Sequence, residues 1–195
     1  KNEKNLQVIL VSSGAVGAGF TSLKLDKKIV ANKQALAAIG QPLLLKHYKK
    51  RFKQHNIVCA QMLFIADDFD SRKRSKNAQN VMEILLDNNI LPIINENDVI
   101  ATEELVFGDN DQLAAHVAYY FKADMLAILS DIDGYYNKNP REFSDAILQK
   151  NISQIDSSQL QMKHSANSEF ATGGIVTKLK ARSEERRVGK ECLGR

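Results

Sequence analysis

The chain has 195 residues, of which 44% are hydrophobic and 26% charged, which is the composition of a globular protein with one sizeable core. A net charge of +4 is too small to indicate a nucleic-acid-binding protein. Residues 182–195, with five basic and three acidic groups, contribute +2 of this charge. No apolar run reaches membrane-spanning length, so we expect a soluble, cytoplasmic protein with neither a membrane nor a nucleic acid as partner.

Strand-like and helix-like segments alternate along the chain. Short apolar runs predict strands at residues 7–11, 58–65, 90–94 and 125–129. Helical spacing of apolar residues covers 29–39, 43–52, 78–86 and 113–121, and Gly40, Gln41 and Pro42 are expected to separate the first two helices. The alternation predicts an α/β fold in which helices cover both faces of a mostly parallel central sheet.

Small residues follow the first predicted strand, beginning with Ser13 and Gly14. Such residues let the backbone approach a ligand closely, and the start of a following helix favours anions. The same residues are equally typical of a tight turn.

Two acidic, amide-rich segments stand where a strand ends and where a helix begins. They are Asn95-Glu96-Asn97-Asp98 and Gly108-Asp109-Asn110-Asp111. In open α/β sheets these edges bind ligands. Carboxylates organise cationic groups, and amides hydrogen-bond amino or carboxylate groups. Turns also favour Asn and Asp on their own account, so each segment alone leaves both interpretations open.

Two later segments suit a phosphorylated ligand. Ser130 and Asp131 follow the fourth predicted strand, where a hydroxyl and a carboxylate can bind the sugar or phosphate side of a nucleotide, or simply cap a turn. A Gly-Gly turn then enters a helix, and its exposed N–H groups and lysine can hold phosphates, although a plain helix entry has the same composition. The residues of this second segment are Thr172, Gly173, Gly174, Ile175, Val176, Thr177 and Lys178.

The cysteines and histidines have no metal-site spacing, so we expect no metal held by the protein itself. Cys59 lies in an apolar run and is expected to be a buried hydrophobe, whereas Cys192 lies in a charged tail, which argues against a disulfide framework.

One basic run precedes a helical pattern, at Arg72, Lys73, Arg74 and Lys76. It lacks interleaved aromatic residues for base stacking. We interpret it as a solvated helix start, or as a patch that steers anionic substrates, rather than as a nucleic-acid site.

Together these motifs resemble the amino acid kinase family. The resemblance covers about residues 6–181 and rests on motifs that occur in the family's order. The two motifs Asn-Glu-Asn-Asp and Gly-Asp-Asn-Asp are similar to those that distinguish the glutamate-phosphorylating branch of the family. The motifs are Ser13-Gly14-Ala15, Gln41-Pro42, Pro92-Ile93-Ile94-Asn95-Glu96-Asn97-Asp98, Gly108-Asp109-Asn110-Asp111, Ser130-Asp131-x-x-Gly134-Tyr135-Tyr136 and Thr172-Gly173-Gly174-x-x-Thr177-Lys178.

The resemblance implies a three-layer αβα sandwich and ATP-dependent phosphorylation of the γ-carboxylate of L-glutamate, the first step of proline biosynthesis. By the same resemblance, Ser13, Asp98 and Asn110 bind glutamate. Ser130, Asp131 and residues 172–178 bind ATP with its Mg²⁺. Lys178 stabilises the transferring phosphoryl group and Asp111 orients the catalytic lysines. The family further implies proline as a feedback inhibitor and a homodimer or homotetramer.

The chain departs from the family at both ends. Family members begin with a strand that carries a phosphate-contacting lysine, and we find no counterpart here. We therefore expect an incomplete kinase domain at residues 1–181, an atypical charged tail at 182–195, and weak or absent turnover by this chain alone.

Three alternatives remain at this stage. One is a different amino acid kinase, acting on acetylglutamate, aspartate, carbamate or a nucleoside monophosphate. Another is an inactive fragment that binds glutamate or proline. The third, a nucleic-acid binder built on the basic run, would need strongly salt-dependent affinity.

Overall fold

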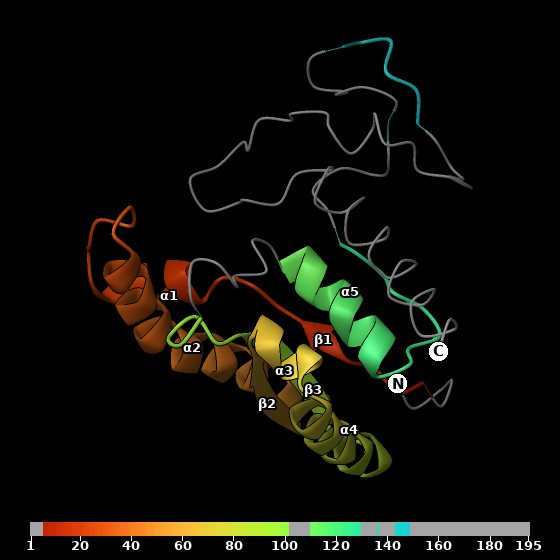
Figure 1. Ribbon diagram of the computed structural model, residues 1–195. Coiled ribbons are helices and arrows are strands. Elements are labelled where there is room, and N and C mark those ends of the chain that lie inside the picture. The colour runs from red at the N-terminus through yellow and green to blue at the C-terminus, as the bar shows by residue number, and fades with distance from the viewer. Residues whose placement is uncertain (1–5, 102–109, 130–135, 137–142, 149–195) are drawn as a thin grey trace. The chain divides into compact units, whose positions relative to one another are not determined.

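The computed structural model describes residues 6–101, 110–129, 136 and 143–148 (Figure 1). The chain divides into two compact units, residues 1–113 and 114–195, and the boundary falls inside helix α5 (Asn110–Tyr120). The first unit holds every strand that the structure describes.

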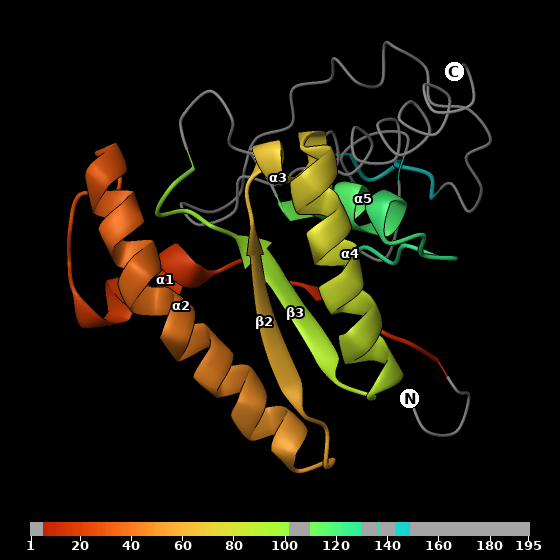
Figure 2. The ribbon, with the colours of Figure 1, turned by 60° about the horizontal axis from the view of Figure 1, so that its bottom comes forward.

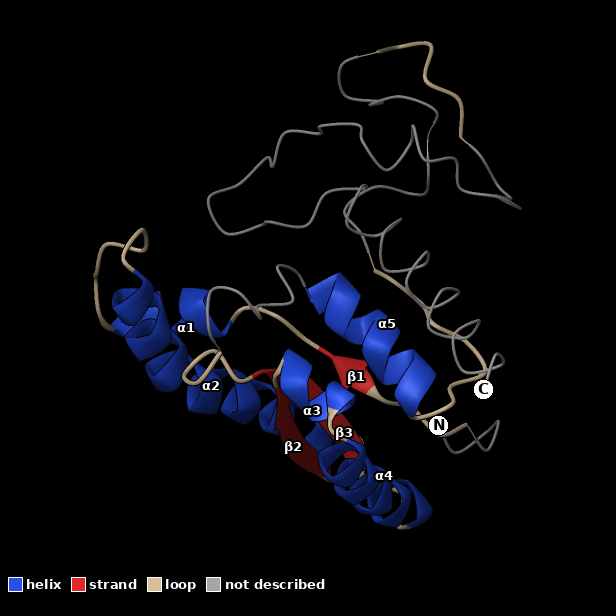
Figure 3. Cartoon of the chain, viewed as in Figure 1, coloured by secondary structure: helices blue, strands red, loops and turns tan. Residues whose placement is uncertain are grey.

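The first unit is built on a parallel sheet of three strands in the order β1-β3-β2. The strands are β1 (Leu10–Val11), β2 (Cys59–Phe64) and β3 (Leu91–Glu96), and they fall on the first three predicted apolar runs (Figure 3). All six residues of the central strand β3 are buried, as expected for a strand covered on both faces. The predicted parallel α/β character is confirmed.

Two long helices cover the sheet, α2 (Val30–Lys53) and α4 (Arg72–Asp87). The chain passes from β1 over β3 to β2 through α2, then returns from β2 to β3 through α4. Right-handed crossovers in opposite directions place their helices on opposite faces of a sheet. Figure 2 shows α2 and α4 on either side of β2 and β3, which gives the three layers of the predicted sandwich.

The predicted break at Gly40, Gln41 and Pro42 is wrong, because α2 runs through all three residues. The reason is tertiary packing against α1 (Ala15–Ser22). A Cβ on Gly40 would lie 1.8 Å from Ala15 O, so the backbones of the two helices touch where only glycine fits. This contact supports the helix where proline removes one internal hydrogen bond.

Strand alternation decides which side chains face α2. Cys59, Leu91 and Ile93 form a buried cluster against the α2 residues Tyr48 and Phe52, with further partly buried members in Leu10, Leu45 and Ile57. Successive side chains of a strand point to opposite faces, so the residue two positions beyond Ile93 shares this face. The α2 side of the sheet is therefore mostly apolar, with Gln61 of β2 as a polar exception, and polar at the carboxyl ends of β1 and β3.

The short helix α3 (Ala66–Asp70) connects β2 to α4. Helix α4 begins six residues before the predicted 78–86 segment, and α5 begins three residues before the predicted 113–121 segment. Both helices gain polar first turns that periodicity of apolar residues does not detect.

In the second unit the predicted strand at residues 125–129 is not formed. These residues pair with no strand in the described part of the chain, and Met125 and Leu129 are 82% and 87% exposed. An apolar run becomes a strand only when a neighbour supplies hydrogen bonds and cover, and the described residues supply neither. The unit also contains an isolated antiparallel bridge between Tyr136 and Leu148. No helix in the described ranges combines the length and apolar character needed to cross a bilayer.

Candidate functional site

Two strands of the sheet end side by side in polar residues. Ser12 follows β1, and its N–H donates to Ile94 O of β3 at 2.8 Å. Asn95 follows Ile94, so the β1–β3 register brings Ser12 and Asn95 opposite each other on the α2 face. The third predicted strand was expected to end at Ile94, but β3 continues to Glu96, and Asn95 is only 3% exposed. Asn95 and Glu96 are buried strand residues rather than loop residues.

Asn110, the first residue of α5, connects these two strand ends. Its side-chain Nδ2 donates to Ser12 O and also to Asn95 Oδ1, the second at 2.7 Å. Asn95 Oδ1 accepts a further hydrogen bond from the N–H of Glu96 at 2.9 Å. A residue predicted at the start of a helix thus contacts both strand ends.

Helix α2 also contacts the same two strand ends. Gln41 Oε1 accepts a 2.8 Å hydrogen bond from Asn95 Nδ2, and Tyr48 Oη lies 2.8 Å from Ser12 Oγ. Ser12 Oγ also donates to Ser13 O at 3.1 Å. We call Gln41, Asn95, Asn110, Ser12 and Tyr48 the amide ring, since these contacts form a closed loop through α2.

The structure places two of the three predicted glutamate residues at this ring. Asn110 belongs to it, and Ser13 adjoins it as an exposed residue after Ser12. Asp98 lies in the turn after β3, where the N–H of Ala101 donates to Asn97 O at 3.0 Å. Gly14, with φ of 105°, precedes α1 as its N-cap, next to Ser13, in a conformation that favours glycine.

Burial raises the pKa of the Asp98 carboxyl above its ordinary value, and a backbone hydrogen bond offsets part of that rise. A carboxylate that has lost part of its hydration is a favourable partner for a cationic ligand group. The side chain therefore suits an ammonium group better than a second anion.

The nucleotide half of the predicted site lies outside the described residues. It comprises Ser130, Asp131 and residues 172–178, including Lys178. Asp111 is described and is the second residue of α5, in partial contact with solvent. In the described ranges, no three His, Cys, Asp or Glu side chains gather as metal ligands would.

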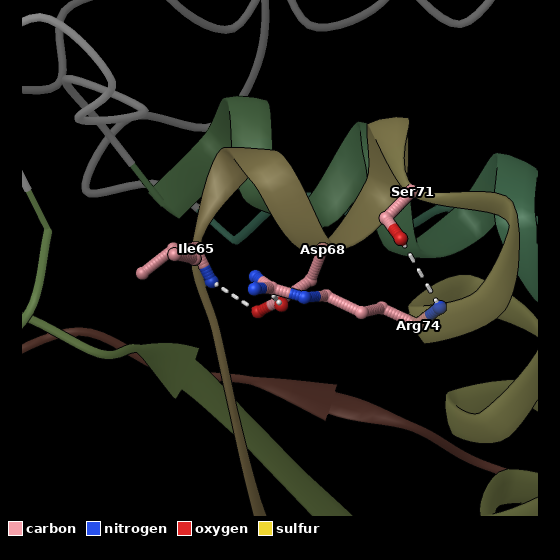
Figure 4. Close-up of polar contacts among 4 residues, drawn as sticks. All are labelled: Ile65, Asp68, Ser71 and Arg74. Atoms are coloured by element: carbon pink, nitrogen blue, oxygen red, sulfur yellow. Dashed lines mark hydrogen bonds and ion pairs between the residues drawn. The ribbon is translucent and has the colours of Figure 1, made fainter.

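The basic run begins α4, as the interpretation of a solvated helix start requires. Arg72, Lys73 and Arg74 are exposed, and Ser71 Oγ accepts from Arg74 N at 3.4 Å. Figure 4 shows Asp68 between two donors, the N–H of Ile65 at 2.9 Å and the guanidinium of Arg74 at 3.2 Å. Basic side chains at a helix N-terminus interact unfavourably with the helix dipole. The negative charge of the Asp68 carboxylate partly offsets the positive charge of this run.

Cys59 is a free, buried thiol in the sheet core, as the sequence predicted. Burial raises its pKa above the ordinary value, and nearby Lys49 lowers it by a smaller amount. A thiol in this state packs as a small hydrophobe and is a poor nucleophile.

The sequence model of the amino acid kinase family matches residues 1–185. The chain belongs to this family. Membership agrees with the parallel sheet, the helices on both of its faces and the polar strand ends described above.

Several curated family members are close in sequence. A glutamate 5-kinase of Wolinella succinogenes is 57% identical over 183 residues, which are 92% of this chain and 70% of that protein. A glutamate 5-kinase of Leishmania donovani is 55% identical over 175 residues, or 90% of this chain and 66% of that protein. A glutamate 5-kinase of Streptococcus sanguinis is 46% identical over 182 residues and is covered to 49%. The chain thus spans about half to 70% of the length of these relatives.

Four members of the amide ring were not predicted as site residues. Asn95 was noticed as part of a polar segment and Gln41 as part of a helix break, and both stand in motifs of the family resemblance, but neither was assigned a role. Ser12 and Tyr48 carried no signal. The one available sequence clue is that Gln41 and Tyr48 stand seven positions apart, about two helical turns, and so share a face of α2.

Proposed function

We propose that this chain is part of a glutamate 5-kinase, which transfers the γ-phosphoryl group of ATP to the γ-carboxylate of L-glutamate. The observation that carries the proposal is the 57% identity to the Wolinella succinogenes glutamate 5-kinase over 92% of this chain. The product is an acyl phosphate: a γ-carboxylate oxygen forms a bond to phosphorus, and the bond to ADP breaks. Such an intermediate fits the first step of proline biosynthesis.

We assign substrate binding to Ser13, Asp98 and Asn110. The desolvated Asp98 carboxylate suits the α-ammonium group of an amino acid, which an N-acetylated substrate lacks. Asn110 offers an amide held by two strand ends, and Ser13 adds an exposed hydroxyl. Binding of this kind fixes the substrate through its α-amino acid end and leaves the γ-carboxylate to react.

We assign ATP binding to Ser130, Asp131 and residues 172–178. ATP brings Mg²⁺, which neutralises charge on its phosphates. Phosphoryl transfer requires positioning and charge neutralisation rather than a protein nucleophile, which suits lysine and glycine residues. In this proposal Lys178 stabilises the transferring group, and Asp111 orients the catalytic lysines. The enzyme acts in the cytoplasm as a homodimer or homotetramer, and proline inhibits it.

Release of ADP from Mg-ATP, measured with L-glutamate and with competing acceptors, tests the proposal. We expect L-glutamate to support turnover, while N-acetylglutamate, aspartate, carbamate and uridine monophosphate do not. The assay uses this chain and a form extended at the N-terminus by the corresponding segment of the Wolinella succinogenes relative. Lys178→Ala should abolish turnover in both forms.

Turnover with N-acetylglutamate or aspartate would instead assign the chain to another branch of the family. Glutamate binding without ADP release in either form would leave only a binding role. Addition of proline to the active form, and its mass in solution, test inhibition and assembly separately.

A further inference from the structure

The amide ring contains three side-chain amides, Gln41, Asn95 and Asn110, and each amide has a donor end and an acceptor end. Two backbone groups at the ring have only one possible role. The N–H of Glu96 must donate, and the carbonyl of Ser12 must accept. These two groups therefore restrict which way every amide in the ring can face.

The restriction propagates through the ring in a fixed order. Because Glu96 N–H donates to Asn95, the end of Asn95 at that point is Oδ1, and its Nδ2 must point to Gln41. Gln41 is then obliged to present its acceptor, Oε1. The amide of α2 and the amide of β3 thus hold each other in one orientation.

The same logic fixes Asn110 from two sides. Ser12 O and Asn95 Oδ1 are both acceptors, so the end of Asn110 that lies between them must be Nδ2. Both hydrogens of that group are used. The carbonyl oxygen of Asn110, on the same planar carbon, is consequently the end directed away from Ser12 and Asn95, and it is a hydrogen-bond acceptor suited to an ammonium group.

We propose that Gln41 and Tyr48 are positioning residues that hold Asn110 with its carbonyl oxygen toward the substrate's α-ammonium group. This inference rests on the proposed function. Gln41 acts through Asn95, and Tyr48 acts through the hydroxyl of Ser12, whose carbonyl group is the other acceptor for Asn110. Neither residue touches the substrate.

The continuous course of α2 makes this arrangement possible. A helix broken at Pro42 would not keep Gln41 and Tyr48 on one face, two turns apart. The close packing of Gly40 on Ala15 supports the helix at that point. The contact between Gly40 and Ala15 therefore packs α1 against α2 and also helps to keep Gln41 and Tyr48 in place for the amide ring.

The test compares Gln41→Met, which removes the acceptor at similar volume, with Gln41→Glu, which keeps an acceptor. Gln41→Met leaves the buried Asn95 Nδ2 without its partner, and we expect the KM for glutamate to rise about 5- to 100-fold with the KM for ATP unchanged. The KM for glutamate of the Gln41→Glu variant should stay within about threefold of that of the unsubstituted protein, the parent. The matched control is Gln79→Met, the same substitution on α4.

Tyr48→Phe is the second variant, with Tyr119→Phe on α5 as its control. Ser12 Oγ keeps its bond to Ser13 O, so we expect a smaller rise in the KM for glutamate, about 2- to 10-fold. Thermal unfolding of each variant separates a loss of positioning from a general loss of folded protein.

The outcomes separate the two proposals. An active parent whose KM for glutamate is unchanged by Gln41→Met overturns the positioning role alone. Equal rises in the KM values for glutamate and ATP, or failure of Gln41→Glu to restore the parent KM, also overturn it because they indicate a merely structural residue. A parent that neither binds nor phosphorylates glutamate overturns the proposed function.

Discussion

The orientation of the amide ring predicts that two isosteric Asn→Asp substitutions have very different costs. Asn110→Asp replaces Nδ2, which donates to two acceptors, with a carboxylate oxygen facing Ser12 O and Asn95 Oδ1. Asn95→Asp replaces a group that donates to one acceptor, Gln41 Oε1. Gln41 can turn its amide and offer Nε2 in place of Oε1, whereas a backbone carbonyl cannot change its role.

The magnitudes follow from the hydrogen bonds that each substitution removes. Asn110→Asp removes two hydrogen bonds and leaves two acceptors facing a third, so we expect a loss of about 3 kcal/mol in the free energy of unfolding. In Asn95→Asp, the new carboxylate accepts from Asn110, from Glu96 N–H and from the turned Gln41, and the loss should be at most about 1 kcal/mol. For a chain of this size the respective falls in melting temperature are roughly 6–12 °C and at most roughly 4 °C.

Thermal and urea unfolding of the two variants, without ligand, measure this difference independently of any activity. A third variant combines Asn95→Asp with Gln41→Glu, which places two carboxylates face to face where neither can donate. Its loss of stability should exceed the sum of the single losses by about 1 kcal/mol or more. The reasoning is refuted if Asn95→Asp costs as much as Asn110→Asp, or if the double variant is additive.

Three further predictions follow from single positions. Because burial raises the pKa of Asp98, its ionised carboxylate destabilises the fold at neutral pH, and this cost disappears as the pH falls through the folded-state pKa. Asp98→Asn should therefore raise the melting temperature at pH 7, as thermal unfolding would measure. The same substitution should weaken glutamate binding, as calorimetric titration would measure. Gly40→Ala would put a Cβ 1.8 Å from Ala15 O and should lower the free energy of unfolding, measured in urea, by about 1–3 kcal/mol or more. The control Ala38→Gly, at an exposed position of the same helix, should lower it by at most about 1 kcal/mol. Cys59 should react with a thiol reagent only as fast as the core opens, so that its labelling rate rises steeply in mild urea; rapid labelling of the folded protein would contradict its burial.

Apolar patterning predicted the layers of this fold well, because burial on both faces leaves a plain signal. The run that became β3 is the clearest case, since all six residues of that strand are buried, whereas only Leu10 and Val11 of the first predicted run form β1. The same signal failed at residues 125–129, since an apolar run cannot indicate whether a partner strand is present. It also failed at Pro42, where the contact between Gly40 and α1 supports a helix that local propensity would end.

The candidate site was predicted only where its residues stand in polar segments. Asn110 stands among the amides and carboxylates at the start of α5, and the family resemblance assigned it to glutamate. Asn95 was noticed but assigned to a loop, since a buried amide inside a strand looks like the end of that strand in sequence. Gln41 and Tyr48 depend on the pairing of α2 with two strand ends, which is tertiary information.

Trapping of the acyl phosphate tests the central claim most directly. With Mg-ATP, L-glutamate and hydroxylamine, γ-glutamyl phosphate is converted to the γ-glutamyl hydroxamate, which can be quantified beside the ADP released. We predict equal amounts of hydroxamate and ADP from the N-terminally extended form, and neither product from its Lys178→Ala variant. Release of ADP without hydroxamate, or hydroxamate that persists in Lys178→Ala, would contradict phosphorylation of the γ-carboxylate by this site.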